Sequence, residues 1–287
     1  MRGLVLLAVL SVLSGVTLTA AQAETAVPAE AAGVAEAAAL ADALDITGLL
    51  AVMHQEGIAY GAELEDGMFP GRGGASWPAA VERIYGNPSW ADEFRQAFAA
   101  ALDDRAADKT AILAFLTSDV GHRAVGLEIS ARRALLDEAV EEASKLKLAE
   151  LRDAKDARLA AIREFVSVND LIDANVMGGL NANLAFYKGL NAAGAFETAM
   201  SEAEILEDVW SQEPALRAET EDWLLSFLVL AYAPLSDADL ADYTAFSRTE
   251  PGQDLNAALF AGFDRVFVKI SAALGSAAAV FAAGEDL

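Results

Sequence analysis

The chain has 287 residues, and its 44 acidic side chains against 20 basic ones give a formal net charge of −24. This charge argues against binding to nucleic acid, whose phosphates require a positive surface, and against anionic membrane surfaces. The sequence contains no cysteine and two histidines, which excludes disulfides, thiolate nucleophiles and cysteine-bound metals. A hydrophobic content of 54% is too high for a mainly disordered chain, and the length fits one large or two ordinary domains.

The first 23 residues predict a signal peptide. Arg2 supplies a positive end, residues 3–19 form an apolar stretch, and Ala21-Gln22-Ala23 gives the small-x-small pattern that signal peptidases accept. An uncleaved anchor is the alternative, but the apolar core is short and small residues follow it directly. We therefore expect cleavage after Ala23 and a periplasmic or secreted protein. Residues 24–41, which are rich in alanine, are expected to form a flexible segment that becomes helical towards Leu40.

From residue 42 onward the sequence predicts helix almost throughout. Apolar side chains recur at the spacing that places them on one face of a helix. They are Trp90, Phe94, Phe98 and Leu102 in one segment and Leu255, Leu259, Phe263 and Phe267 in another. Between helices, the proline- and glycine-rich residues 67–78 mark a loop. The apolar run Trp223–Pro234 is shorter than the roughly 20 residues that span a bilayer, so we expect a core helix and no transmembrane span after cleavage.

An internal repeat divides this helical region. The segment Ala114–Gly121 aligns with Ala245–Gly252 at an offset of 131 residues (246 − 115), and both carry the pattern Phe-x-x-[Ser/Thr]-x-x-Gly. We predict an all-α fold of two related multi-helix halves, each built around an αα-hairpin. The first helical repeat is expected to cover 42–140, a charged connecting helix 141–165, and the second helical repeat 166–287.

Each residue of the shared pattern has a role in an αα-hairpin. The aromatic residue ends one helix in the core. Ser118 or Thr249 is expected to cap the next helix by accepting a hydrogen bond from a backbone N–H. Gly121 and Gly252 then fall at the third helical position, where the absence of Cβ lets two helix ends approach closely. The pattern therefore indicates a role in the fold and not a catalytic or binding site.

The second copy also resembles a known family. The stretch Leu235–Leu240, followed by Phe246, Thr249 and Gly252, resembles the domain of unknown function 2059, whose hallmark is an acidic-leucine helix start and then Phe-Tyr-x-Ser-Pro-x-Gly. Here Ser247 replaces the tyrosine, threonine stands for serine, and the proline falls one place late. The resemblance is clear over residues 235–270 and fainter over 108–136. It implies an exported, bacterial, all-helical protein, and it implies no activity, cofactor or partner.

The segment between the two copies is dense in charge. Residues 132–165 carry both signs at helical spacings, and Glu141 with Lys145 forms a favourable i,i+4 pair. This pattern favours a solvated helix that joins the halves. A dimerising coiled coil would need a sustained heptad, which the segment lacks.

The sequence offers few residues for catalysis. His54 is expected in mid-helix with no acid at contact spacing, which is typical of a partly buried or surface histidine. Ser118, Asp119 and His122 lie close together in the manner of a triad, but Ser118 is expected to cap a helix, and the second copy has Gln253 in place of the histidine. Phosphate-loop, nucleophile-elbow, zinc and calcium patterns are missing from the sequence. We predict no catalytic, cofactor-binding or metal-binding residue.

Three functions remain open at this point. The first is a periplasmic binding or scaffolding protein without catalysis, whose ligand is a protein, a peptide or an apolar molecule held between helices. The others are a carboxylate-based periplasmic hydrolase and a structural component of the cell envelope. A large pocket with inward-facing acids would favour the hydrolase, and an apolar groove would favour ligand binding. The small residues and asparagines between Asn175 and Asn191 indicate either close helix packing, which we favour, or the lining of a cleft.

Overall fold

The computed structural model of the chain describes residues 29–196 and 198–284. This part of the chain is built from α-helices and contains no strand, which confirms the all-α prediction. The predicted signal peptide, residues 1–23, and its cleavage site lie outside the described residues. The alanine-rich segment is helical from Ala29, earlier than expected, because Leu40 and Ala41 are buried and hold this helix against the core.

The helices follow one another with short connections. The first six are α1 (Ala29–Ala43), α2 (Ile46–Met68), α3 (Ser76–Tyr85), α4 (Trp90–Asp104), α5 (Lys109–Leu116) and α6 (Asp119–Ala134). The next two are α7 (Glu138–Ala154) and α8 (Ala157–Val168). The last five are α9 (Leu171–Ala192), α10 (Glu202–Ser211), α11 (Glu213–Tyr232), α12 (Asp237–Ser247) and α13 (Glu250–Ala283).

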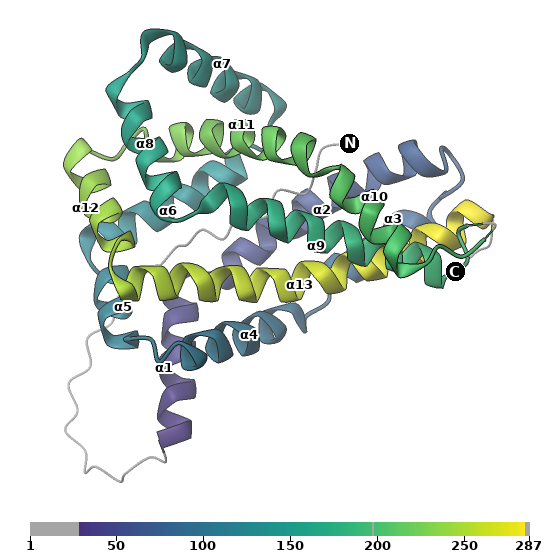
Figure 1. Cartoon of the computed structure of the whole chain (residues 1–287), viewed down its shortest axis with the longest axis horizontal. Helices are drawn as coiled ribbons and strands as arrows, with labels where there is room; N and C mark the ends of the chain where they lie inside the picture. The colour runs from purple at the N-terminus through teal and green to yellow at the C-terminus, as the bar shows by residue number, and fades with distance from the viewer. Residues whose placement is uncertain (1–28, 197, 285–287) are drawn as a thin grey trace.

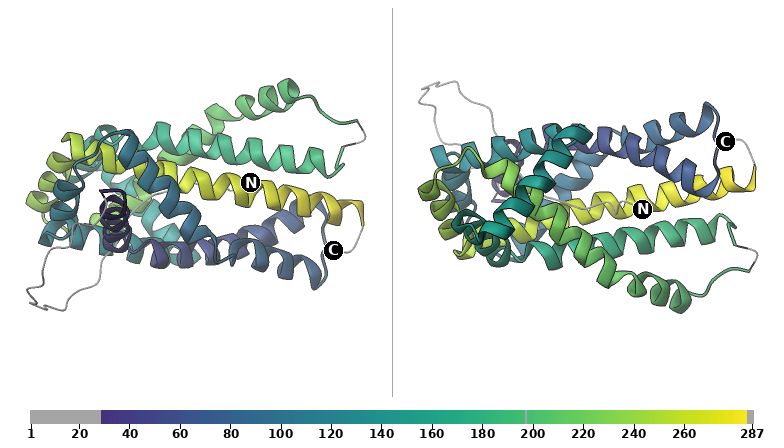
Figure 2. Two further views of the ribbon diagram at one scale, coloured as in Figure 1. Left: turned by 90° about the horizontal axis from the view of Figure 1, so that it is seen from below. Right: turned by 90° about the horizontal axis from the view of Figure 1, so that it is seen from above.

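Helix α13 is the axis of the molecule. It packs along α9 and α4 (Figure 1), and the pairs α2–α3 and α9–α10 lie on opposite sides of its C-terminal half (Figure 2). Glycine allows the closest crossing, because a Cβ on Gly275 would lie 2.1 Å from the carbonyl oxygen of Phe186 on α9. A Cβ on Gly189 would likewise lie 2.3 Å from the carbonyl oxygen of Ala272. These two glycines therefore allow α9 and α13 to pack closely along their length.

The same helix is long and apolar enough to cross a membrane by length and composition. Half of its most apolar window is buried inside the fold, where it contacts α9, α4 and α3. A core helix of this length passes the same test as a membrane span. The apolar run at Trp223–Pro234 is the C-terminal part of α11, where Leu224, Phe227 and Leu228 are completely buried.

The two copies of the repeated pattern have the same local geometry. The hydroxyl of Ser118 accepts a hydrogen bond from the N–H of Gly121 at 3.1 Å, and the hydroxyl of Thr249 accepts one from Gly252 at 3.2 Å. A Cβ on Gly121 would lie 2.1 Å from the carbonyl oxygen of Phe115, and a Cβ on Gly252 would lie 2.2 Å from that of Phe246. The predicted caps and the predicted need for glycine are therefore observed in both copies.

The copies also contact each other. The rings of Phe115 and Phe246 stack with centroids 3.7 Å apart and an interplanar angle of 4°. Helix α6 of the first copy packs on α11, and α13 of the second copy packs on α4. The division of the whole chain into two related halves stays a prediction.

The charged connection differs from the single helix expected at 141–165. The chain forms α7 and α8 with a sharp turn between them, where Lys155 takes a left-handed conformation with φ of 50° and Asp156 caps α8. As predicted, the Glu141–Lys145 pair forms, with 2.8 Å between Oε1 and Nζ. Only Ser144 and Leu148 of α7 are buried, so this helix is attached to the fold by one narrow face.

Candidate functional site

Two of the residues considered for catalysis, His54 and Ser118, have partners in the fold. His54 lies in the middle of α2, half-buried, with its Nε2 3.1 Å from Oε1 of Glu82 on α3. The Ser118 hydroxyl donates to a backbone carbonyl at 2.7 Å and accepts from Gly121, so it is engaged as a helix cap. Nε2 of His122 is buried without a hydrogen-bond partner among the described residues. Within residues 29–196 and 198–284, no group of three or more histidines and acids is placed to hold a metal ion.

The asparagine-rich stretch of α9 is closely packed. The side-chain amide of Asn175 is buried and donates to the backbone of Leu171 at 2.7 Å. Asn181 donates to the carboxylate of Asp264 on α13 at 2.8 Å. The side-chain amide of Asn191 donates to the carbonyl of Met200 and accepts from its N–H, each at 2.9 Å. These side chains therefore fix neighbouring segments of the chain.

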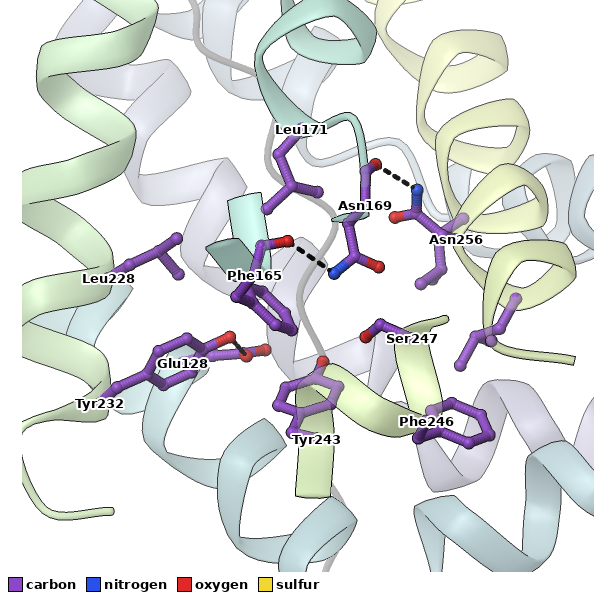
Figure 3. A pocket seen from close by; sticks show the side chains of 13 residues that line it. Glu128, Phe165, Asn169, Leu171, Leu228, Tyr232, Tyr243, Phe246, Ser247 and Asn256 are labelled. Atoms are coloured by element: carbon purple, nitrogen blue, oxygen red, sulfur yellow. Dashed lines mark hydrogen bonds between the residues drawn. The ribbon is translucent and has the colours of Figure 1, made fainter. Parts of the chain in front are cut away.

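A polar cavity lies where α6, α8, α11, α12 and α13 meet (Figure 3). Its volume of about 30 Å³ is enough for one or two water molecules. Glu128 on α6 is 1% exposed and accepts a hydrogen bond from the hydroxyl of Tyr232 on α11. The hydroxyl of Tyr243 points towards the same space, and the side chain of Asn256 on α13 donates to the backbone carbonyl of Asn169 at 2.7 Å.

Both tyrosines of this cavity are held in the neutral form. Burial raises the pKa of Tyr232 and of Tyr243 well above 10.0, and the nearby negative charge of Glu128 raises both further. At neutral pH the phenols are therefore hydrogen-bond donors and not bases. The cavity lacks room for anything larger than water, so this cluster joins five helices and does not accommodate a substrate.

An apolar groove lies between α7 and α11. Its volume is about 340 Å³, within the range of about 300–1,000 Å³ typical of ligand pockets. It is lined by Ala139, Val140, Ala143, Ser144 and Lys147 on α7 and by Val229, Leu230 and Ala233 on α11. None of these residues is acidic. The hydroxyl of Ser144 donates to the backbone carbonyl of Ser226 at 2.6 Å and so ties α7 to α11 beside the groove.

Sequence reasoning missed both features for different reasons. Glu128 interrupts the buried face formed by Ala124, Val125 and Ile129, so a charge on an apolar helical stripe was the signal for the polar cavity. The groove has no comparable signal. Its walls are ordinary alanine, valine and leucine, and it exists because α7 lies over α11 between the turns at Asp137 and Lys155.

Comparisons with protein-family models, with curated proteins and with solved structures found no match to this chain. The resemblance to the domain of unknown function 2059 therefore stays a prediction. In the part of the chain described, the protein is all-helical and has a water-sized polar cavity and a ligand-sized apolar groove.

Proposed function

We propose that this chain is an exported envelope protein that binds an apolar ligand without catalysing a reaction on it, and that the ligand lies in the groove between α7 and α11. The observation that supports this proposal most directly is the contrast between the two cavities. The groove has ligand-sized volume and no acidic residue in its lining. The cavity with the inward-facing carboxylate of Glu128 has room for water alone. Export rests on the predicted signal peptide at residues 1–23.

The lining residues indicate the chemistry of the ligand. Alanine, valine and leucine side chains offer dispersion contacts and no hydrogen-bond donor or acceptor, which suits a hydrocarbon chain. The ammonium group of Lys147 is the one charge among the lining residues, and it lies 3.0 Å from the carboxylate of Glu150 on the solvent-facing side. An acyl chain with an anionic head group matches both features, because the head group can compete with Glu150 for Lys147.

The carboxylate-based hydrolase is the weaker alternative. Hydrolysis by acids requires a carboxyl group that reaches a bound substrate. Glu128 is engaged with Tyr232 in a cavity of about 30 Å³, which a substrate cannot enter without separating five helices.

The proposal is tested by displacement of a fluorescent apolar probe, N-phenyl-1-naphthylamine, from the mature chain by dodecanoate and by dodecanol. We expect both competitors to displace the probe, with dodecanoate favoured. Ala143→Phe fills the groove and should abolish probe binding, whereas Ala149→Phe, on the exposed side of α7, should leave it unchanged. Lys147→Ala should weaken dodecanoate to the level of dodecanol. Equal probe binding by the Ala143→Phe variant and the unmodified protein would refute the proposal.

A further inference from the structure

Helix α10 exposes two large apolar side chains on one ridge. Leu206 is 42% exposed and Trp210 is 47% exposed, and their i,i+4 spacing places them on consecutive turns of the same face. Ile205 and Val209, on the adjoining face about 100° around the helix, are each 2% exposed and pack in a small cluster with α9. The ridge is thus separate from the contacts that hold α10 on the fold. A tryptophan at this exposure is unusual on a protein surface unless it meets a partner.

Helix α3 in the first part of the chain can be compared with α10. Each is the third helix before the capped helix of its copy, which is α6 for α3 and α13 for α10. Helix α3 lies between α2 and the C-terminal half of α13. There, Trp77 is 1% exposed, with its ring 5.4 Å from that of Phe281 on α13 and 5.0 Å from that of Phe69. An apolar helix thus covers the tryptophan of α3.

Helix α10 has no such cover in the described residues. Its described packing is against α9 and α11 (Figure 2). The segment that follows α6, which is the counterpart of the C-terminal half of α13, turns away at Asp137 and lies over α11 as α7. The ridge of Leu206 and Trp210 is therefore an exposed apolar surface on α10, whereas the tryptophan of α3 is covered by α13.

The charge around the ridge selects the kind of helix that fits. Helix α10 carries four acidic residues, Glu202, Glu204, Glu207 and Asp208, and no basic residue. All four are exposed. We propose that the ridge of Leu206 and Trp210 docks an amphipathic helix of a partner protein that presents an apolar face flanked by lysine or arginine. The apolar face covers Leu206 and Trp210, and a cation placed over the indole adds a favourable contact. The basic flanks meet the two acids that border the ridge, which are Glu207 and Glu202, the latter one turn before Leu206 and paired with Lys188.

The same charges disfavour the other occupants of such a surface. A second copy of this chain would bring one acidic α10 against another, and like charges across an interface oppose association. An anionic lipid surface would repel the helix for the same reason. A basic helix alone gains from both the apolar ridge and its acidic border.

The test measures binding of a fluorescein-labelled, 18-residue amphipathic peptide of leucine and lysine to the mature chain by anisotropy. We expect the double variant Leu206→Ser/Trp210→Ser to lose at least tenfold in affinity. Leu146→Ser is the matched control, because Leu146 is 66% exposed on α7 and has an acid one turn away on each side, Glu142 and Glu150. This control should bind the peptide as the unmodified protein does.

A second pair of variants tests the charge without altering the ridge. Glu202→Lys/Glu207→Lys should weaken the peptide and reduce the salt dependence of binding. Glu63→Lys/Asp66→Lys, which makes the same charge change on exposed positions of α2, should have a much smaller effect. Unchanged affinity in the Leu206→Ser/Trp210→Ser variant, or an equal loss in Leu146→Ser, would overturn the proposal. So would a dimer in analytical ultracentrifugation, or binding to phosphatidylcholine vesicles, that depends on Leu206 and Trp210.

Discussion

The two copies of the Phe-x-x-[Ser/Thr]-x-x-Gly pattern begin their helices in the same way and then diverge. Ser118 and Thr249 cap α6 and α13 with hydrogen bonds of 3.1 and 3.2 Å, and the following glycines meet the preceding helix at the same place. Yet α6 has 16 residues and α13 has 34. The pattern therefore fixes where a helix starts and how it leaves the previous one, and other residues decide how far it runs.

The divergence has a local cause. Asp137 accepts a hydrogen bond from the N–H of Ala139 at 2.9 Å and starts α7 in a new direction. The corresponding residue of the second copy, at an offset of 131 (268 − 137), is Val268, which has no side-chain acceptor and lies within α13. A further difference lies in the polar cavity, where Glu128 of α6 corresponds to Leu259 of α13 (259 − 128 = 131), and both line the same space. One copy thus supplies the carboxylate, and the other supplies the apolar wall.

Replacement of Gly121 or Gly252 should have the largest effect on the helix-start geometry that the two copies share. Gly121→Leu and Gly252→Leu should each cost more than about 3 kcal/mol, because even the first carbon of the side chain would overlap a backbone carbonyl. Urea denaturation followed by circular dichroism measures the loss, and Gly121→Ala and Gly252→Ala keep it measurable if the leucine variants do not fold. Gly126, in the same helix α6, is the control because a Cβ there meets nothing within 4 Å. Gly126→Ala should raise stability by up to about 1 kcal/mol.

The stacked phenylalanines test whether the copies depend on each other. Phe115→Ala and Phe246→Ala should each cost about 2–3 kcal/mol, below the full cost of a core phenylalanine because both rings are partly exposed. In a double-mutant cycle, the stacking at 3.7 Å predicts a coupling of about 0.5–1.5 kcal/mol. Strictly additive losses would mean that the contact contributes nothing beyond the burial of each ring.

Local sequence signals were sufficient for the elements and insufficient for their assembly. The caps at Ser118 and Thr249 both depend on residues within one turn, and the structure contains each of them. The groove depends on how α7 lies over α11 between the turns at Asp137 and Lys155, and Lys155 is a non-glycine residue with a φ of 50° that no local pattern indicated. The Glu128–Tyr232 bond joins residues 104 positions apart, so only the folded chain reveals it.

The polar cavity predicts a loss of stability at alkaline pH. Burial raises the pKa of Tyr232 and Tyr243, so the folded state holds the phenolic protons more tightly than the unfolded chain. The stabilisation is complete below the unfolded pKa of about 10 and is lost as the pH rises above it, by up to about 1.4 kcal/mol per pH unit for each tyrosine. Urea denaturation between about pH 9 and 11 should show this fall. The variant Tyr232→Phe/Tyr243→Phe should reduce it, and the remainder belongs to Tyr85 and Tyr60, whose pKa values burial also raises. An unchanged slope would contradict the assignment.

The smallest expected effect tests the shared cap itself. Ser118→Ala and Thr249→Ala each remove the oxygen that accepts the N–H of the glycine three residues later, and each should lower stability by about 1 kcal/mol. Ser130→Ala is the control, because this exposed hydroxyl bonds to the carbonyl of Gly126 within α6 and caps nothing. Thr249→Ser retains the acceptor and should keep the stability of the unmodified protein. The two alanine variants should lose similar amounts of stability, because they lose the same hydrogen bond. If one lost much more than the other, the surrounding helices would contribute more to that helix start than the repeated residues do, and the two helix starts would not be equivalent.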